Sequence, residues 1–308
     1  MIPEALVIFL LAASIDILLG EPPARIHPVV WIGKLISSLR ARALARERPT
    51  RLQGFVLALT VIIATALAGY LLVLAASVVP IFGILVAAYL LKSTFAMRCL
   101  LQVSSDIGKM IDRDISSAKN MLPALVGRET KDLTRSQATS AVIESLSENY
   151  VDSILSPIFY YVLFSPFGLG LEAALAFKAM STMDSMLGYK TKGLKELGFA
   201  AAHLDDLANF LPARLSIFFM ALARPTKAGD TIRAALNYHK RTPSPNSGWP
   251  MSACAGALGI RLEKPGYYVL LDEGQEPDTS DVPRAVWFMA ATTALTLAAS
   301  AIVLLWTA

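Results

Sequence analysis

Three carboxylates spaced four residues apart are the first candidates for chemistry in this sequence. Glu144, Glu148 and Asp152 lie in "VIESLSENYVDSILSP", residues 142–157, which runs directly into the apolar stretch "IFYYVLF". Steps of four residues advance a helix by roughly 40°, so the three side chains fall within an arc of about 80°. Carboxylates on one face repel one another, which favours raised pKa values or a bound cation. This face is a candidate magnesium site, because magnesium on substrate phosphates needs only one or two protein carboxylates.

Insertion energy excludes one alternative for this face and leaves another open. A charge at the bilayer centre costs roughly 2.5 to 3.5 kcal/mol, so three carboxylates facing lipid would cost about 8 to 10 kcal/mol. Exposure to lipid is therefore excluded. The helix could still present the face to water, and spacing alone does not decide between water and a site. Asn149, between the second and third carboxylates, favours the site.

Other polar groups stand in apolar surroundings. Asp184, in the helix expected over "EAALAFKAMSTMDSMLGY", is either a site residue or an ion-pair partner. Lys178, six residues earlier, lies on a different face of that helix. Asp205 and Asp206 in "HLDDLANFLPARL" are either site residues or caps of the following helix, and Arg214 belongs to the same stretch.

Three further stretches carry candidate binding groups. In "GRETKDL", residues 127–133, Arg128 is a candidate phosphate ligand, with a solvated turn as the alternative. His27 precedes a proline, which holds its backbone extended, and it is either structural or functional. In "NSGWPMSACAGALGIRL", residues 246–262, Asn246 and Trp249 accompany small residues that allow close backbone approach; helix packing is the alternative.

The composition predicts that the chain is an integral membrane protein, so the candidate residues above belong to membrane helices or to the segments that connect them. The chain has 308 residues, of which 55% are hydrophobic and 17% charged, and its mean hydropathy is +0.52; soluble domains carry about 25% charged residues. Residues 54–91 contain no charge, and one helix of that length would be roughly 57 Å long against a hydrocarbon core of about 30 Å. This run therefore predicts two crossings with a turn near Pro80 and Gly83.

Further membrane elements are expected at both ends of the chain. Residues 285–308 predict a span with Trp287 and Trp306 near its ends. The first 20 residues predict an uncleaved membrane helix, because Glu4 stands where a signal peptide has basic residues. Residues 98–122 predict a helix that leaves the bilayer, and residues 240–283 a cytoplasmic loop region with an exposed, mobile acidic tail.

Prolines and glycines interrupt the apolar pieces of residues 153–190, which predicts half-helices around a cavity. Residues 209–222 are too short to span and predict an interfacial or internal helix. The expected fold is all-α: one polytopic integral membrane domain over residues 1–308, with about four to six membrane helices, some of them broken or re-entrant, and cytoplasmic helical loops.

Lysine and arginine concentrate in residues 20–53, 98–135 and 188–241, which predicts that these segments are cytoplasmic and the N-terminus outside. This bias explains the net charge of +4 without a nucleic-acid partner. The pattern lacks zinc spacing, a Walker A loop and a G-x-G-x-x-G fingerprint. For Cys99 and Cys254, two buried free thiols are favoured over a disulfide.

Taken together, six stretches resemble the adenosylcobinamide-phosphate synthase family, the CobD/CbiB proteins of cobalamin biosynthesis. They are "DILLGEPPARIHPVVWIGKLI", "VGRET", "VIESLSENYVDSILSPIFYYVLF", "AFKAMSTMDSMLGYK", "DDLANFLPARL" and "NSGWPMSACAGALGIRL", in the family's order from about residue 15 to residue 262. The chain departs from the family in three places: Glu21 replaces the usual Asp, Tyr150 replaces a small Thr, and Ser181, Thr182, Met183 and Asp184 stand where the family usually has Asn-Thr-Leu-Asp.

The resemblance implies an ATP-dependent ligase that joins adenosylcobyric acid to 1-amino-2-propanol phosphate or a relative such as threonine phosphate. Magnesium and ATP are then required, and the acidic face becomes a site rather than a solvated surface. The implied catalytic residues are Glu148, Asp152, Asp184 and His27. The implied magnesium ligands are Glu148 and Asp152, with Asp184 or Glu144. The implied substrate-binding residues are Asn149, Arg128, Lys178, Arg214, Asp205, Asp206, Asn246 and Trp249.

In this interpretation Arg128, Lys178 and Arg214 neutralise phosphates, His27 or one of the two adjacent aspartates is the base, and the segment around Trp249 helps to form the corrin cavity. The expected location is the plasma membrane, with the active site facing the cytoplasm and a possible complex with the cobalamin synthase that acts next. The alternatives are a transporter or channel with an acidic pathway, a non-catalytic regulatory homologue, and a prenyl or CDP-alcohol transferase. The last would need D-D-x-x-D, and "DDLAN" lacks the final acid.

Overall fold

The computed structural model describes residues 3–45, 49–127, 129–188 and 194–307, and this part of the chain is predominantly helical. Its contacts divide the chain into two compact units. Unit 1 comprises Met1–Ala96, Ser156–Ala208 and Ala299–Ala308, and unit 2 comprises Met97–Leu155 and Asn209–Ala298. The single domain expected over residues 1–308 stays a prediction.

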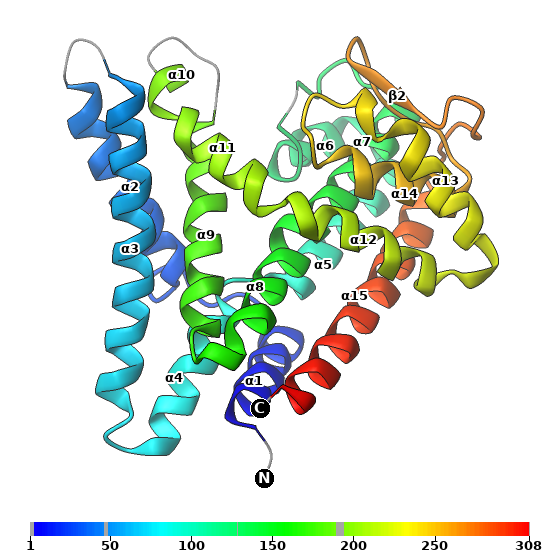
Figure 1. The fold of residues 1–308 in the computed structure, drawn as a ribbon. Coiled ribbons are helices and arrows are strands. Elements are labelled where there is room, and N and C mark those ends of the chain that lie inside the picture. Colours follow the sequence, from blue (N-terminus) through cyan, green and yellow to red (C-terminus); the bar gives the residue numbers. More distant parts are fainter. Residues whose placement is uncertain (1–2, 46–48, 128, 189–193, 308) are drawn as a thin grey trace. The chain divides into compact units, whose positions relative to one another are not determined.

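Unit 1 is a group of packed helices. They are α1 (Glu4–Leu19), α2 (Pro28–Leu44), α3 (Arg51–Ala76), α4 (Pro80–Lys92), α8 (Ser156–Phe164), α9 (Gly170–Leu187), α10 (Leu194–Leu197) and α11 (Phe199–Ala208), as labelled in Figure 1. A 3-10 turn, Ser165–Phe167, separates α8 from α9. The interruptions predicted for residues 153–190 are therefore present, but α9 runs unbroken through Asp184.

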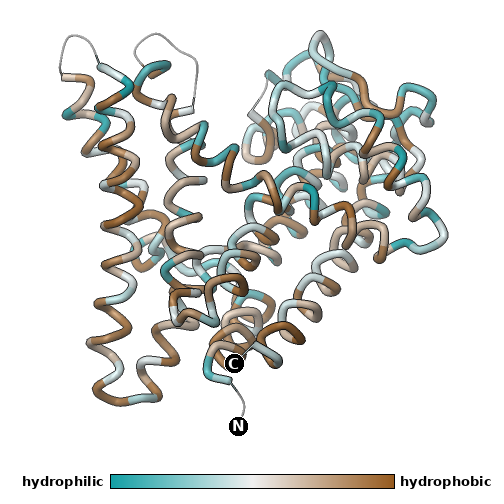
Figure 2. Tube along the Cα trace, viewed as in Figure 1, coloured by the Kyte–Doolittle hydropathy of each residue, from teal (hydrophilic) through white to brown (hydrophobic). Residues whose placement is uncertain are grey.

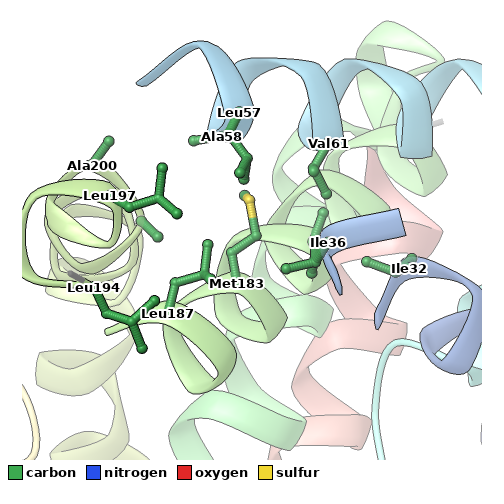
Figure 3. Close-up of a cluster of buried hydrophobic side chains, with 12 residues drawn as sticks. Ile32, Ile36, Leu57, Ala58, Val61, Met183, Leu187, Leu194, Leu197 and Ala200 are labelled. Atoms are coloured by element: carbon green, nitrogen blue, oxygen red, sulfur yellow. The ribbon is translucent and has the colours of Figure 1, made fainter. Parts of the chain in front are cut away.

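A cluster of buried hydrophobic side chains joins α2, α3, α9, α10 and α11 (Figure 3). It consists of Ile32, Ile36, Leu57, Ala58, Val61, Ala179, Met183, Leu187, Leu194, Leu197, Ala200 and Ala201. α3 can approach α10 closely because residue 54 is a glycine: a Cβ at Gly54 would lie 2.3 Å from the carbonyl oxygen of Leu197. This core holds α9, which carries Lys178 and Asp184, against α3 and α11.

The uncharged run at residues 54–91 forms two helices, as predicted. α3 begins with a capping box, in which the Thr50 hydroxyl accepts from the backbone N–H of Gln53 and the Gln53 side chain accepts from that of Thr50. The chain turns at residues 77–79, and α4 starts at Pro80, a position where a missing N–H is tolerated. An exposed ion pair of 2.8 Å between Arg51 and Glu196 links the basic segments 20–53 and 188–241 within this unit.

Unit 2 combines helices with one small β-hairpin. Its helices are α5 (Met97–Arg113), α6 (Ile115–Met121), α7 (Arg135–Tyr150), α12 (Phe210–Ala223), α13 (Ala228–Tyr238), α14 (Gly248–Leu258) and most of α15 (Asp281–Trp306). A π-helical turn, Val151–Leu155, follows α7, and 3-10 turns occupy Leu122–Ala124, Pro225–Lys227 and His239–Arg241. The antiparallel strands β1 (Leu262–Lys264) and β2 (Tyr268–Leu270) pair in the register Leu262 to Leu270.

The prediction of a loop region over residues 240–283 is right only in part. Residues 271–280 are turns and irregular backbone with exposed acidic side chains, but a helix and a hairpin occupy much of the rest, and prolines and glycines mark the ends of these elements. Pro250 lies in the first turn of α14, a buried helix that packs on α7, α12 and α13. Gly266, with a φ of 76°, lies in the turn between the strands. The acidic tail is also held in place: Glu276 accepts hydrogen bonds from Ser136 and Arg261.

Among the described residues, four helical stretches are long and apolar enough to cross a membrane: Arg51–Ala76, Pro80–Arg113, Phe199–Ala223 and Asp281–Trp306. Figure 2 shows the first and last of these mostly in the brown of hydrophobic residues. The chain is therefore an all-α polytopic membrane protein, as predicted. α1 is helical, also as predicted, but with 16 residues it is shorter than these stretches, so its crossing stays a prediction.

Two predicted helices differ in part from the structure. Residues 209–222 form a short helix, α12, as predicted, but α12 follows α11 directly, and the two together make the 25-residue apolar stretch Phe199–Ala223. The helix expected over residues 98–122 breaks at Asp114, whose carboxylate accepts from the backbone N–H of Ser116 and so caps α6. Cys99 and Cys254 form no disulfide, as predicted, but only Cys254 is buried and Cys99 is partly exposed.

Candidate functional site

The structure brings four of the predicted site residues together around one cavity in unit 2. Glu144, Glu148, Asn149 and Asp152 line a hollow of about 230 Å³. Its other lining residues are Leu125, Val126, Gly127, Ala141, Ser145, Lys264 and Tyr268. The periodicity of the carboxylates thus placed them correctly on one face, and that face lines a cavity.

The local backbone explains how this face is presented. α7 starts at a capping box, in which Thr134 and Gln137 exchange side-chain and backbone hydrogen bonds. After Tyr150 the helix widens into the π-helical turn that contains Asp152. Single π-turns occur frequently at functional sites, because the extra residue shifts the direction of the side chains that follow. Asn149 folds back on α7, where its amide nitrogen donates to the carbonyl and the hydroxyl of Ser145.

Glu144 has a structural arrangement that sequence reasoning did not anticipate. Its side chain is buried, and its two oxygens accept from the Ser140 hydroxyl at 2.7 Å and the Tyr268 hydroxyl at 2.6 Å. Ser140 in turn accepts from the backbone N–H of Glu263 in β1. This carboxylate therefore joins α7 to the hairpin, whereas Glu148 and Asp152 lie further along the cavity wall.

The hairpin supplies two cavity residues that the sequence reading missed. Lys264 ends β1 and Tyr268 begins β2, and both line the cavity. The signal was the pattern "RLEKPGYYVLL", in which a Pro-Gly pair separates two short apolar runs. The high proline and glycine content of the region masked it. Lys264 is a basic residue of the cavity lining, and its ammonium lies 4.9 Å from the centre of the exposed Tyr267 ring.

The donor types in this cavity fit a magnesium ion that arrives on a nucleotide. Glu148 and Asp152 carry hard oxygen donors four residues apart, and nucleotide-borne magnesium is bound through one or two such carboxylates. Within residues 3–45, 49–127, 129–188 and 194–307, no group of three or more His, Cys, Asp or Glu side chains is arranged to hold a metal by itself. The cavity therefore suits a magnesium ion whose ligands come partly from the nucleotide phosphates and partly from the protein.

A second group in unit 2 assembles three predicted substrate-binding residues. Arg214 donates to Asn246 Oδ1 at 3.1 Å and to the carbonyl oxygen of Phe210 at 2.7 Å. Its guanidinium carbon lies 3.5 Å from the centre of the Phe210 ring and 5.0 Å from that of Trp249. Arg214, Asn246 and Trp249 therefore form one cluster.

The remaining predicted acids belong to unit 1. Asp184 and Lys178 lie on α9, and Asp205 and Asp206 lie on α11, which packs against it. The capping alternative for the two aspartates is wrong, because α12 begins after Asn209 and has no side-chain cap. Asp184 lies within electrostatic range of Asp206. Whether Asp184 or Lys178 joins the carboxylates of α7 stays a prediction, and Arg128 lies outside the described residues.

His27 is held by two hydrogen bonds in unit 1. Its Nδ1 accepts from the backbone N–H of Val29, which caps α2, and its Nε2 lies 2.9 Å from Glu21 Oε2. A backbone N–H only donates, so the ring proton sits on Nε2 and is donated to the carboxylate. His27 would have to break its cap to act as a base.

The same carboxylate leads to a buried network that the sequence reading missed. Lys92 Nζ lies 2.7 Å from Glu21 and 3.0 Å from Asp16, and the side chains of Lys92 and Asp16 are fully buried. The sequence signal was present, because Lys92 ends a long uncharged run and Asp16 interrupts an apolar one. Ionisable residues at membrane depth usually pair with one another.

Comparison with known proteins decides the family. Residues 9–298 match the family model described as CobD/Cbib protein. The chain belongs to the CobD/CbiB family. It is 50% identical to the "Probable cobalamin biosynthesis protein CobD" of Methanothrix thermoacetophila over 97% of this chain and 96% of the relative.

Bacterial members of the CobD/CbiB family are similar as well. The "Cobalamin biosynthesis protein CobD" of Pelobacter propionicus is 40% identical, with 84% of this chain and 80% of the relative covered. The protein of that name from Klebsiella pneumoniae is 38% identical over 82% and 81%. No solved structure matches the chain. The predicted resemblance is confirmed: the chain belongs to a family whose named members are cobalamin biosynthesis proteins.

Proposed function

We propose that this CobD/CbiB family member forms an amide bond between adenosylcobyric acid and (R)-1-amino-2-propanol phosphate, or threonine phosphate, at the expense of ATP. The product is adenosylcobinamide phosphate. The observation that carries the proposal is the cavity in which Glu148, Asn149 and Asp152 meet Lys264, in a chain that belongs to this family. Protein carboxylates can bind a substrate amine or a magnesium ion, and a lysine can bind a phosphate or a substrate carboxylate, which are the groups that take part in this reaction.

The chemistry requires activation, because a carboxylate is a poor acylating agent. Transfer of the γ-phosphoryl group of ATP to the propionate oxygen gives an acyl phosphate and ADP, and amine attack then releases phosphate. Magnesium supplies charge neutralisation to the phosphates during transfer. Glu148 and Asp152 would hold that ion, and Lys264 would neutralise a phosphate oxygen beside them. Asn149 commits its amide nitrogen to Ser145, which leaves its oxygen to accept from an amine N–H.

The size of the cavity limits what it can take. At about 230 Å³ it is smaller than the roughly 300–1,000 Å³ of sites for drug-sized ligands. It suits the reacting phosphate and amine ends and not a whole corrin ring. The corrin would lie elsewhere, and the cluster of Arg214, Asn246 and Trp249 offers it or its phosphate-bearing partner a flat aromatic surface and a cation.

Turnover of the full chain in detergent tests the proposed reaction. The purified protein is incubated with adenosylcobyric acid, magnesium, ATP and either aminopropanol phosphate or threonine phosphate, and the corrin product and ADP are followed. Product with one amine, matched by ADP, supports the proposal. Folded protein that yields no product with either amine contradicts it, and solute flux into liposomes without nucleotide turnover would favour a transporter.

Two variants test the site separately from the function. Glu148→Gln and Asp152→Asn should each lower turnover by about 100-fold or more and raise the magnesium requirement, because each removes a charge from the cavity. Glu276→Gln and Asp272→Asn are matched controls, since both acids are exposed and pair with arginines outside the cavity. Full turnover and unchanged magnesium dependence in both site variants would refute the assignment while leaving the reaction intact.

The protein lies in the plasma membrane, its site opens to the cytoplasm, and it forms a complex with the cobalamin synthase of the same pathway. The bias of lysine and arginine toward three segments supports this orientation. Labelling of Arg42→Cys and Val78→Cys in intact cells, each in a chain whose Cys99 and Cys254 are replaced by alanine, would test it. Labelling by an impermeant reagent at Val78 but not at Arg42 is expected, and the reverse pattern would contradict the orientation.

A further inference from the structure

The chain has three histidines, and their hydrogen bonds define where each ring proton lies. In His27 both ring nitrogens are engaged, because Nδ1 accepts from Val29 N–H and Nε2 donates to Glu21. In His239, Nδ1 lies 2.9 Å from the carbonyl oxygen of Ala235. A carbonyl oxygen only accepts, so the His239 proton sits on Nδ1 and its Nε2 carries a lone pair.

The lone pair of His239 is not used within the described part of the chain. Both of the hydrogen bonds that its ring makes there involve Nδ1, to the carbonyl oxygens of Ala235 and Leu236. The ring is only partly exposed. His239 therefore has the tautomer and the solvent access that it needs to accept a proton at Nε2.

A close backbone approach fixes the position of His239. A Cβ at Gly248 would lie 2.0 Å from the carbonyl oxygen of His239, so the start of α14 reaches the His239–Arg241 turn only because residue 248 is a glycine. That approach brings the next residue, Trp249, against the histidine. The two rings stack with centroids 3.6 Å apart and an interplanar angle of 17°. The stack restricts the imidazole to one plane.

The surroundings of this stack point to a ligand. Arg214 lies over the Trp249 ring and donates to Asn246. The indole nitrogen of Trp249 is shielded from solvent and has no hydrogen-bond partner among the described residues. A buried tryptophan N–H usually finds an acceptor. A cation, an amide and an unsatisfied donor thus meet beside an imidazole with an available lone pair.

We propose that His239 is the proton acceptor for the attacking amine, with Trp249 and Arg214 beside it as groups that hold the phosphate-bearing substrate. This inference rests on the proposed amide-forming function. The neutral amine attacks the acyl carbon and forms the C–N bond, and its nitrogen passes one proton to Nε2 of His239. The bond between the acyl carbon and the phosphate oxygen breaks, and phosphate leaves with the electron pair. The imidazolium then returns its proton to solvent.

His203 provides a matched control, because it shares the local features but not the surroundings. Its Nδ1 lies 2.8 Å from the carbonyl oxygen of Phe199, four residues earlier, and its ring stacks on Phe199. The tautomer is therefore the same as in His239. His203 is exposed on α11. Arg51 lies 4.3 Å from the centre of the Phe199 ring, so a cation over the stacked ring is shared as well. The difference is that His203 stacks on an exposed phenyl ring, whereas His239 stacks on an indole whose N–H is shielded and unsatisfied among the described residues.

The test separates the two half-reactions in the full-length protein in detergent. Hydroxylamine traps acyl phosphates without a protein base, so ADP release in its presence reports activation alone. His239→Ala should retain this activation and lose amide formation by at least about 100-fold, the usual range for a lost general base. Added imidazole should restore part of the amide rate. His203→Ala should match the unaltered protein in both assays.

Several outcomes would overturn the inference. Amide formation by His239→Ala at the rate of the unaltered protein would do so, and so would equal loss of both half-reactions without rescue by imidazole in a variant with unchanged thermal stability. His239→Gln, which keeps a polar side chain of similar size but cannot accept the proton, covers the case in which the alanine variant fails to fold. If the unaltered protein forms no amide, the proposed function fails instead, which the same assay shows.

Discussion

Lys92 Nζ lies 3.0 Å from the carboxylate of Asp16, and neither side chain is exposed to solvent. The same ammonium donates to Glu21 at 2.7 Å. One buried cation therefore pairs with two carboxylates, that of Asp16 in α1 and that of Glu21 in the segment after α1. Loss of one partner of a buried pair costs about 3–5 kcal/mol, because it leaves a charge without compensation. The network therefore fixes α4 to α1 and to the segment that ends at His27.

Lys92→Met is expected to destabilise the protein by about 3–5 kcal/mol. The double variant Asp16→Asn with Lys92→Met should lose less, because it removes the stranded carboxylate as well. Thermal and denaturant unfolding in detergent measure both. Arg51→Ala is the control, since its pair with Glu196 is exposed and should contribute at most about 1 kcal/mol. A double variant that is less stable than Lys92→Met would contradict this account.

Glu21 should give the protein a stability contribution that is lost in acid. Burial acts to raise the pKa of Glu21, but hydrogen bonds from His27 and Lys92 outweigh it and hold the pKa below the ordinary value of 4.5. A carboxyl whose folded pKa is lowered stabilises the fold fully above its unfolded pKa and stops doing so as the pH falls through the folded one.

Glu21→Gln should therefore be less stable than the unaltered protein at neutral pH. The difference should shrink as the pH falls below 4.5, the ordinary value of this carboxyl. Unfolding curves of both proteins over this pH range give the comparison. A difference that stays constant in acid would show that the carboxylate charge is not the stabilising feature.

Glu144→Gln distinguishes a structural carboxylate from a magnesium ligand. A glutamine offers one acceptor where Ser140 and Tyr268 both donate, so the variant should lose about 1–3 kcal/mol of stability. Because Glu148 and Asp152 remain, the magnesium concentration for half-maximal turnover should not change. Tyr268→Phe should cost about 0.5–1.5 kcal/mol by removing one of these bonds. A raised magnesium requirement in Glu144→Gln would instead place this residue among the ligands.

Two glycine substitutions should have opposite effects. Gly248→Ala should destabilise the protein by about 1–3 kcal/mol, because its methyl group would meet the His239 carbonyl at 2.0 Å. Gly229→Ala, in the first turn of α13, meets open space and should be neutral or stabilise by about 0.4–1 kcal/mol. Unfolding measurements decide, and equal effects of the two changes would argue against the close approach.

The sequence predicted those features that repeat along the chain. Hydropathy revealed the helix pair α3 and α4, and four-residue spacing placed Glu148 and Asp152 on one face. Both signals are local, because helical periodicity and the thickness of a bilayer act on contiguous residues.

What the sequence did not reveal depends on contacts between distant residues. Lys92 meets Asp16 across 76 positions, and the hydroxyl of Tyr268 reaches Glu144 across 124. The hairpin was hidden because proline and glycine mark turns as readily as long loops. The free nitrogen of His239 required a hydrogen bond whose acceptor carbonyl only a folded helix presents.

Unit 1 is assembled from three separate segments of the chain, which determines when its contacts can form during synthesis on the ribosome. Its residues come from the first 96 positions, from 156–208 and from the last ten, so its core around α9 cannot close until more than half of the chain has been made. The Asp16–Lys92 pair needs only the first of these segments. A nascent chain can thus neutralise the fully buried charges of Asp16 and Lys92 early, before the partners of its hydrophobic faces have left the exit tunnel.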